Sequence, residues 1–390
     1  MSATERLPNE ILLEILSDIT LGERIFVDAM NERPLNVKRT SLYTVSQVCQ
    51  RWRSLSGYLP GWQRVVLDHV DVQGPKLQKV KSWREEYGVV LRRVLEIARS
   101  TGRSLEVKCD FVDQWPDDGR TMLESRALSR LVQADISWKA FEYVHTPFTS
   151  LDWACNTLAF VRSKFGGWEY FGMDMDDGPI EDETHSVADL AELMAEMSNL
   201  RRLSLRMGYR GDWHWHSNNA WSFPSLTISA LRVRVTGAVG VVLLKMCPQV
   251  KNAVIWVEGK DTRKAGEEEN PPDDGSVFSA TDLKTLMLVI LDDRVTFTQI
   301  LTRMRCPRLE QLVFEWPRKL EAELIECGAS ALRAFIERPR EGSLTGEVYF
   351  PYARKSKMGL GYIEDHGLKR LRAAPREYWL DQWGEPLFLE

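Results

Sequence analysis

Two short stretches carry the side chains best suited to bind a metal ion. In "DWHWH", Asp212, His214 and His216 alternate, so on a strand all three would point to one side. "DMDDG" offers carboxylates from Asp174 onward, but an EF-hand calcium loop needs Gly at its sixth position and Gly178 stands at the fifth. Neither stretch is joined by a further cluster with ligand spacing. We therefore expect no metal site, and a histidine pair in a loop or on the surface.

Catalytic motifs are also missing from the sequence. There is no GxSxG nucleophile elbow, no GxxxxGK[ST] phosphate loop and no GxGxxG after a strand-like run. Cys49 has no nearby His and falls on the apolar face of a helical pattern, which predicts a buried structural thiol. The sequence therefore indicates no catalytic residues and no cofactor. Because nucleophiles and bases can be scattered along a chain, a hydrolase or transferase on an α/β fold stays as an alternative.

Length and composition set the broad class. The 390 residues suggest two or three domains or one elongated array. A net charge of −5 disfavours binding to nucleic acid. The longest apolar runs, such as "LMLVIL" at 286–291, are too short to cross a membrane. Six cysteines without a CxxC pair are typical of a reduced, intracellular protein, cytoplasmic or nuclear.

The N-terminal region predicts two amphipathic helices. Pro8 is suited to a helix start, and apolar residues follow it at helical spacing: Ile11, Leu12, Ile15, Leu16 and Ile19. A second helix is predicted at 39–56, with its own apolar face: Leu42, Val45, Val48, Cys49, Trp52 and Leu55. Two such helices make a poor core by themselves. They must pack either on the rest of the chain or against a partner that covers part of the apolar face.

Three blocks in this region occur in an order that resembles the F-box family. They are "LPNEILLEIL", "VSQVCQRWRSL" and "PGWQRVVL", and together they cover about residues 1–67. The chain departs from the family pattern in one place, because the connection at about 20–38 is longer than usual.

The resemblance implies a role in protein ubiquitination. F-box domains dock on the Skp-type adaptor of a cullin-RING ubiquitin ligase, and the rest of the chain recruits a protein substrate. The positions carried over as adaptor contacts are Leu7, Pro8, Ile11, Leu12, Ile15, Val45, Val48, Cys49 and Trp52. Some of these residues are expected to be internal packing residues of the domain.

The remaining sequence repeats the pattern apolar-x-x-apolar-x-apolar. The copies are Trp62/Val65/Leu67, Phe148/Leu151/Trp153, Leu200/Leu203/Leu205, Ile228/Leu231/Val233, Val250/Ala253/Ile255, Leu283/Leu286/Leu288 and Leu309/Leu312/Phe314, with a weaker copy at 104–111. Helical patterns lie between the strand-like copies, at 89–100, 186–197, 238–247 and 295–306. One strand and one helix per unit predict a leucine-rich-repeat solenoid.

The predicted fold is α/β, with a short α-helical F-box domain followed by an irregular leucine-rich-repeat-like solenoid. The domains are predicted at 1–70 and 71–390, and an aromatic cap is predicted at about 341–390. The whole resembles F-box proteins of a fungal type with degenerate leucine-rich repeats. The alternative is an α/β domain with a parallel sheet. Two acidic segments, 174–183 and 259–275, are predicted to be solvated loops.

The sequence therefore predicts the substrate-recognition adaptor of a Skp–cullin–F-box type ubiquitin ligase, without catalytic residues, cofactor, nucleic acid or membrane. Its partners would be the Skp-type adaptor, through it a cullin-RING ligase, and an unknown protein substrate. A repeat scaffold whose F-box has drifted and no longer joins a ligase remains an alternative.

Overall fold

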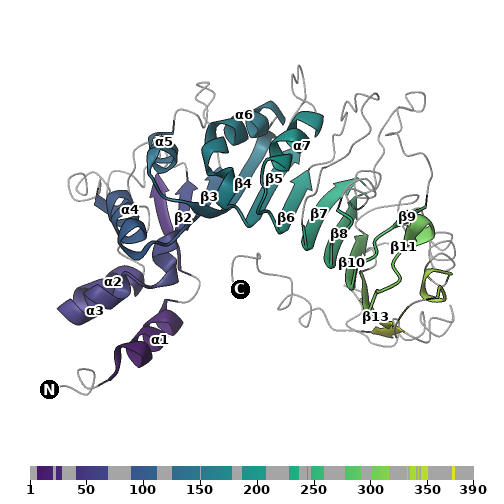
Figure 1. Cartoon of the computed structure of the whole chain (residues 1–390), viewed down its shortest axis with the longest axis horizontal. Helices are drawn as coiled ribbons and strands as arrows, with labels where there is room; N and C mark the ends of the chain where they lie inside the picture. Colours follow the sequence, from purple (N-terminus) through teal and green to yellow (C-terminus); the bar gives the residue numbers. More distant parts are fainter. Residues whose placement is uncertain are drawn as a thin grey trace. The chain divides into compact units, whose positions relative to one another are not determined.

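The computed structural model (Figure 1) describes most of the secondary structure of the chain. The described residues are 7–20, 23–28, 41–68, 89–111, 125–149, 151–177, 187–207, 228–236, 244, 247–258, 277–290, 301–315, 332, 334–339, 341, 344–349 and 371–373. They belong to two compact units, Met1–Gly172 and Met173–Glu390, and each unit is described by itself.

The first unit opens with helix α1, Asn9–Ile19. Pro8 occupies the N-cap position, where its missing N–H leaves no bond unmade. Leu12 and Leu16 are fully buried, so they form the inner face of the helix. The helix ends at Thr20, whose Oγ1 donates to the carbonyl oxygen of Leu16 at 2.8 Å. The predicted helix start after Pro8 is therefore confirmed.

The second predicted helix, 39–56, is wrong as a single element. It is divided into α2, Ser41–Val48, and α3, Gln50–Ser56. Between them Cys49 adopts an extended backbone (φ −160°, ψ 171°) and caps α3 by accepting a hydrogen bond from the backbone N–H of Trp52. The apolar spacing runs through this break, which is why the sequence pattern did not reveal it. A short 3-10 helix, η3 at Pro60–Gln63, follows.

The sheet of the first unit contains β1 (Ile25–Asp28), β2 (Arg64–Asp68), β3 (Leu105–Phe111), β4 (Trp138–Thr149) and the start of β5 (Tyr170–Asp177). These strands follow one another in chain order, and β1 to β4 are parallel. Strand β1 lies inside the connection at 20–38, where we predicted only an unusually long link. The long connection is therefore part of the sheet.

Helices connect the parallel strands. They are α4 (Val89–Thr101), α5 (Arg126–Gln133), α6 (Leu151–Val161) and the 3-10 helix η7 (Arg162–Gly167). The α4 helix confirms the prediction at 89–100, and its apolar face is buried as expected. The α5 helix starts at Ser125, whose Oγ accepts a hydrogen bond from the N–H of Leu128 at 3.1 Å.

The predicted strand at 148–153 is wrong. Helix α6 starts at Leu151, and the strands on either side of it are β4 and β5, which the repeat pattern missed. In β4 the neighbours Ala140 and Phe141 are both buried, as are Tyr143 and Val144. A strand that is buried on both faces shows no alternation of apolar and polar residues, so its period of two is hidden.

Stacked aromatic rings fill the core between β4 and β5. The rings of Trp138 and Trp168 are nearly parallel, at an interplanar angle of 2° and a centroid distance of 6.5 Å. Phe141 stacks on Trp168 at 4.9 Å, and Phe165 meets the same indole at 60°. All four side chains are buried. Such pairs stabilise a core beyond the area that they bury.

The second unit continues the same architecture. After α7 (Val187–Ala195) come the parallel strands β6 (Arg202–Met207), β7 (Ala230–Thr236), β8 (Asn252–Glu258), β10 (Thr285–Ile290), β12 (Gln311–Glu315), β13 (Thr345–Tyr349) and β14 (Leu371–Ala373), in that order. Two short strands, β9 (Phe278–Ser279) and β11 (Met304–Arg305), form a separate parallel pair.

One turn recurs before four of these strands. A backbone N–H donates to the carbonyl oxygen three residues earlier: Leu200 to Met197, Val250 to Cys247, Leu283 to Ala280 and Leu309 to Cys306. The apolar positions that follow it fall in register across the sheet, with Leu203, Leu231, Ala253, Leu286 and Leu312 paired in one row. The residues of these turns and of this row are all apolar and buried. The periodic pattern in the sequence therefore corresponds to a periodic backbone.

The described residues thus form a mixed α/β fold with N-terminal helices and a parallel sheet. Of the predicted helices, 186–197 is confirmed by α7, whereas 238–247 lies almost wholly outside the described residues. Most of the predicted cap at 341–390 and the whole of 259–275 also lie outside them. The acidic segment at 174–183 begins on β5 rather than in a loop.

Candidate protein-docking surface

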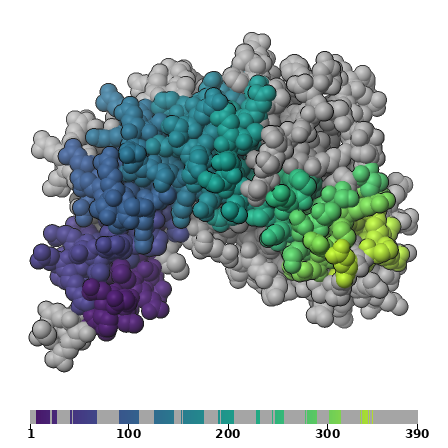
Figure 2. All heavy atoms as spheres, viewed as in Figure 1, coloured from purple at the N-terminus to yellow at the C-terminus, as the bar shows by residue number. Residues whose placement is uncertain are grey.

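Helix α1 has two apolar faces, and only one of them is used by the core of the first unit. Leu12 is 0% exposed, whereas Ile11, Ile15 and Ile19 are 44%, 41% and 51% exposed. Residues four apart lie above one another on a helix, so the three isoleucines form one row, which we call the isoleucine row. Figure 2 shows the atoms of α1, in dark purple, at the surface of the molecule. Neighbouring exposed apolar side chains are typical of an interaction site.

A second exposed apolar position lies at the junction between α2 and α3. Val48 is 56% exposed, and Cys49 beside it is also exposed. The predicted burial of the Cys49 thiol is therefore wrong. The extended backbone at Cys49 interrupts the helix and leaves the thiol as an N-cap, outside the inner face that the helical spacing predicted.

Arg51 ties the two elements together. Its Nε and Nη2 atoms donate to the side-chain oxygen of Asn9 at 3.0 and 2.7 Å, and Nη2 also donates to the carbonyl oxygen of Leu7. Charged, bidentate donors make comparatively strong hydrogen bonds. The start of α1 is therefore held against α3, and the isoleucine row has a defined position relative to Val48.

The long connection supports the same helices from inside the domain. The carboxylate of Glu23 accepts hydrogen bonds from the backbone N–H groups of Ser41 (2.7 Å) and Leu42 (2.9 Å) at the start of α2. These N–H groups have no partner within the helix, so a carboxylate here stabilises it. Ile25 and Val27 of β1 are buried and pair with β2.

The structure divides the nine predicted contact residues into three groups. The exposed residues are Pro8, Ile11, Ile15, Val48 and Cys49; those of intermediate exposure are Leu7 and Trp52; the buried ones are Leu12 and Val45. The buried pair packs inside the domain. Ile19 completes the isoleucine row and was not among the predicted contacts, although its spacing of four from Ile15 was visible in the sequence.

Within the described residues, no three His, Cys, Asp or Glu side chains come together as a metal site would need. "DWHWH" lies outside those residues. In the part of the chain that the structure describes, no helix has the length and apolar character needed to cross a bilayer.

The helical domain at the start of the chain thus carries an exposed apolar row and is followed along the chain by a parallel sheet. Residues 4–68 match the family model of the F-box-like domain, so the chain contains an F-box-like domain. A search of curated proteins found no match. F-box domains generally bind Skp-type adaptors, typically occur in non-catalytic subunits, and indicate a ubiquitin-ligase adaptor role in general.

Proposed function

We propose that this chain is the substrate-recognition subunit of a Skp–cullin–F-box type ubiquitin ligase, acting inside the cell in the cytosol or nucleus. The observation that carries the proposal is the isoleucine row on the domain that matches the F-box-like family. The Skp-type adaptor would cover this row together with Val48 and Cys49.

The energetics favour such a cover. Each isoleucine of the row keeps roughly half of its side chain in water. Burying the rest would contribute about 1 kcal/mol for each residue, given about 25 cal/mol for each Å² of apolar surface removed from water. The buried Leu12 and Leu16 hold the helix from the other side, so docking requires no unfolding. A preformed surface loses little entropy when it binds.

The sheet would present the protein target. The recurring turn and the in-register apolar rows of the second unit support an irregular leucine-rich-repeat-like array, in which each unit buries its apolar side against its neighbours. The same backbone hydrogen bonds also recur at the start of successive strands. The carbonyl oxygen of Lys251 accepts from Lys284 and Thr285, and that of Lys284 accepts from Glu310 and Gln311. A surface built from repeated units suits the binding of a protein rather than a small molecule.

In this mechanism the chain brings the target close to the enzyme and does not itself catalyse the reaction. Holding a target beside a ubiquitin-loaded enzyme raises the effective concentration of the target's lysine side chains. The chain contributes two binding surfaces, one for the adaptor and one for the target. Its own residues need not donate or accept a proton at the reacting atoms.

Co-purification with a Skp-type adaptor tests the proposal. Wild type should bind, and an Ile11→Asp/Ile15→Asp variant should not, because both changes place a charge on the isoleucine row. Val277→Asp is the matched control, since Val277 is 53% exposed and lies in the second unit. Circular dichroism should show that all three proteins are folded. A folded wild type without adaptor binding would favour a non-ligase scaffold or an α/β enzyme instead.

A further inference from the structure

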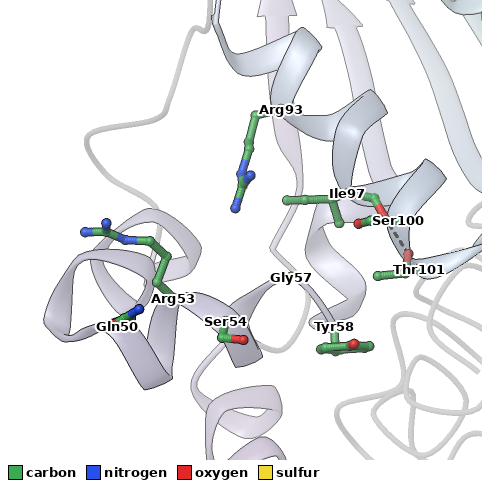
Figure 3. Close-up of a pocket in the computed structure, with 9 residues that line it drawn as sticks. All are labelled: Gln50, Arg53, Ser54, Gly57, Tyr58, Arg93, Ile97, Ser100 and Thr101. Atoms are coloured by element: carbon green, nitrogen blue, oxygen red, sulfur yellow. Dashed lines mark hydrogen bonds between the residues drawn. The ribbon is translucent and has the colours of Figure 1, made fainter.

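A cavity of about 320 Å³ lies between α3 and α4 in the first unit (Figure 3). Helix α3 and the turn after it form one wall, and α4 forms the other. The polar residues that line it are Gln50, Arg53, Ser54 and Tyr58 on the first wall and Arg93, Ser100 and Thr101 on the second. Ile97, which is 4% exposed, supplies an apolar surface between them.

The charge around this cavity is strongly positive. No carboxylate lines it. The segments 50–58 and 89–103 together hold six arginines and a single acidic residue, Glu96, although the whole chain has a net charge of −5. Glu96 lies 3.7 Å from Arg93, but both side chains are about half exposed. Exposed pairs of this kind are weak, so Arg93 can exchange Glu96 for a ligand at little cost.

Several side chains of the cavity walls donate hydrogen bonds to backbone carbonyl groups. Arg53 donates from Nε to the carbonyl oxygen of Ser46 at 3.1 Å, which turns its guanidinium group toward α2 and away from α4, as Figure 3 shows. Arg103 donates to the carbonyl oxygen of Tyr58 at 2.8 Å and joins the end of α4 to the turn after α3. The hydroxyl groups of Ser100 and Thr101 donate to the carbonyl oxygen of Ile97. The charged donor that faces the cavity is therefore Arg93, and Arg53 lies at its rim. The planar fork of an arginine suits carboxylate and phosphate groups.

We propose that this cavity binds an acidic segment of the recruited target protein, whose carboxylate or phosphate groups contact Arg93 in the cavity and Arg53 at its rim. The identification of the occupant as a target rests on the proposed function.

Two observations favour the target over the adaptor as the occupant. Half of the cavity comes from α4, which lies outside the F-box-like match at 4–68. Figure 1 also shows the α2–α3 pair between α1 and α4, so the cavity is on the other side of that pair from α1. A protein that covers the isoleucine row of α1 therefore lies on the other side of the α2–α3 pair from the α4 wall of the cavity.

Fluorescence anisotropy on the full chain tests the proposal with three labelled peptides. One carries three consecutive glutamates in a Gly-Ser frame, one carries phosphoserine at those positions, and one carries lysine. Saturable binding of either acidic peptide, weakened by salt, is the expected result. Arg53→Gln/Arg93→Gln should raise the Kd about tenfold or more, because charge-assisted hydrogen bonds are lost.

The matched control is Arg92→Gln/Arg99→Gln, which removes the same charge from exposed positions of α4 outside the cavity. It should change the Kd by no more than about twofold, as screened surface charges do. Equal weakening by the two double variants, equal binding of the lysine peptide, or no saturable binding by folded wild type would each overturn the proposal.

Adaptor co-purification on the same variants separates this inference from the proposed function. Arg53→Gln/Arg93→Gln should retain the adaptor. If it loses the adaptor and keeps the acidic peptide, the adaptor is the occupant and the proposal is wrong. If wild type binds the acidic peptides but no adaptor, the ligase role fails while the anionic site at the cavity stands.

Discussion

Leu42 fills the space that a side chain at Gly61 would need. A Cβ atom on Gly61 would overlap Cδ1 of Leu42 and lie 3.1 Å from the carbonyl oxygen of Glu23. Leu42 is fully buried at the start of α2, so it has little freedom to move aside. The turn before β2, the first turn of α2 and the long connection therefore meet at one crowded point.

Gly61→Ala should lower the free energy of unfolding by about 1–3 kcal/mol, the usual effect of forcing a methyl group into a packed core. Urea unfolding followed by circular dichroism measures it. Gly166→Ala is the control, because a Cβ there meets nothing within 4 Å. It should change stability by no more than about 0.5 kcal/mol. Equal stability of the two variants would mean that the crowding at Gly61 is relieved without strain.

Glu23→Ala should destabilise the first unit by about 1 kcal/mol, because two N–H groups at the start of α2 lose their acceptor. The measurement is again urea unfolding. Glu14→Ala removes the same charge from an exposed position of α1 and should be nearly neutral. If both variants behave alike, the connection at 20–38 does not support α2.

Cys49 should be the fastest cysteine to react with iodoacetamide among those in the described residues. It is exposed, whereas Cys109, Cys155, Cys247 and Cys306 are buried. Peptide mass spectrometry gives the rate at each thiol. If the adaptor covers the junction of α2 and α3, its presence should slow alkylation of Cys49 by about tenfold, the effect of about 1.4 kcal/mol of protection. An unchanged rate in the complex would place Cys49 outside the interface.

Stability should fall at alkaline pH. Burial raises the pKa of the Cys247 thiol from 9.0 to about 12, because the thiolate is disfavoured in an apolar site. The unfolded chain releases this proton near pH 9, whereas the folded chain keeps it until the pH approaches 12. The stability that the protonated thiol contributes is therefore fully present below pH 9 and is lost as the pH rises towards 12. The expected slope is about 1.4 kcal/mol for each pH unit. Burial also raises the pKa of Tyr143, which adds to the effect above pH 10.

The contribution of Cys247 can be isolated by substitution. Cys247→Ala should show a shallower loss of stability between pH 9 and pH 11 than wild type, in urea unfolding at each pH. Identical slopes for the two proteins would show that this thiol does not titrate differently in the folded and unfolded states.

The sequence predicted the elements that bury one face and expose the other. Helices α1 and α4 have this character, and both were found where their apolar period placed them. Strand β4 was missed because it is buried on both sides, and the break at Cys49 was missed because the apolar spacing continues across it.

The candidate contacts show a further limit of sequence reasoning. Ile11 and Leu12 are adjacent and chemically alike, yet one is exposed and the other is fully buried. Only the packing of α1 on the rest of the first unit decides which of them faces inward. A sequence pattern can identify an apolar helix, but it cannot divide its residues between an internal core and an external interface.

The pairing of β1 with β2 also constrains how the chain acquires its structure during synthesis. Ile25 lies opposite Val65, and α2 and α3 occupy the chain between them, so β1 has no partner until both helices have been made. The other edge of β2 has no partner until β3 has been made. A nascent or truncated chain that ends just after residue 68 would present an unpaired edge rich in valine, which is a template for aggregation. We therefore expect the F-box-like segment to be protected from aggregation by residues that are translated after it, because β3 covers this edge.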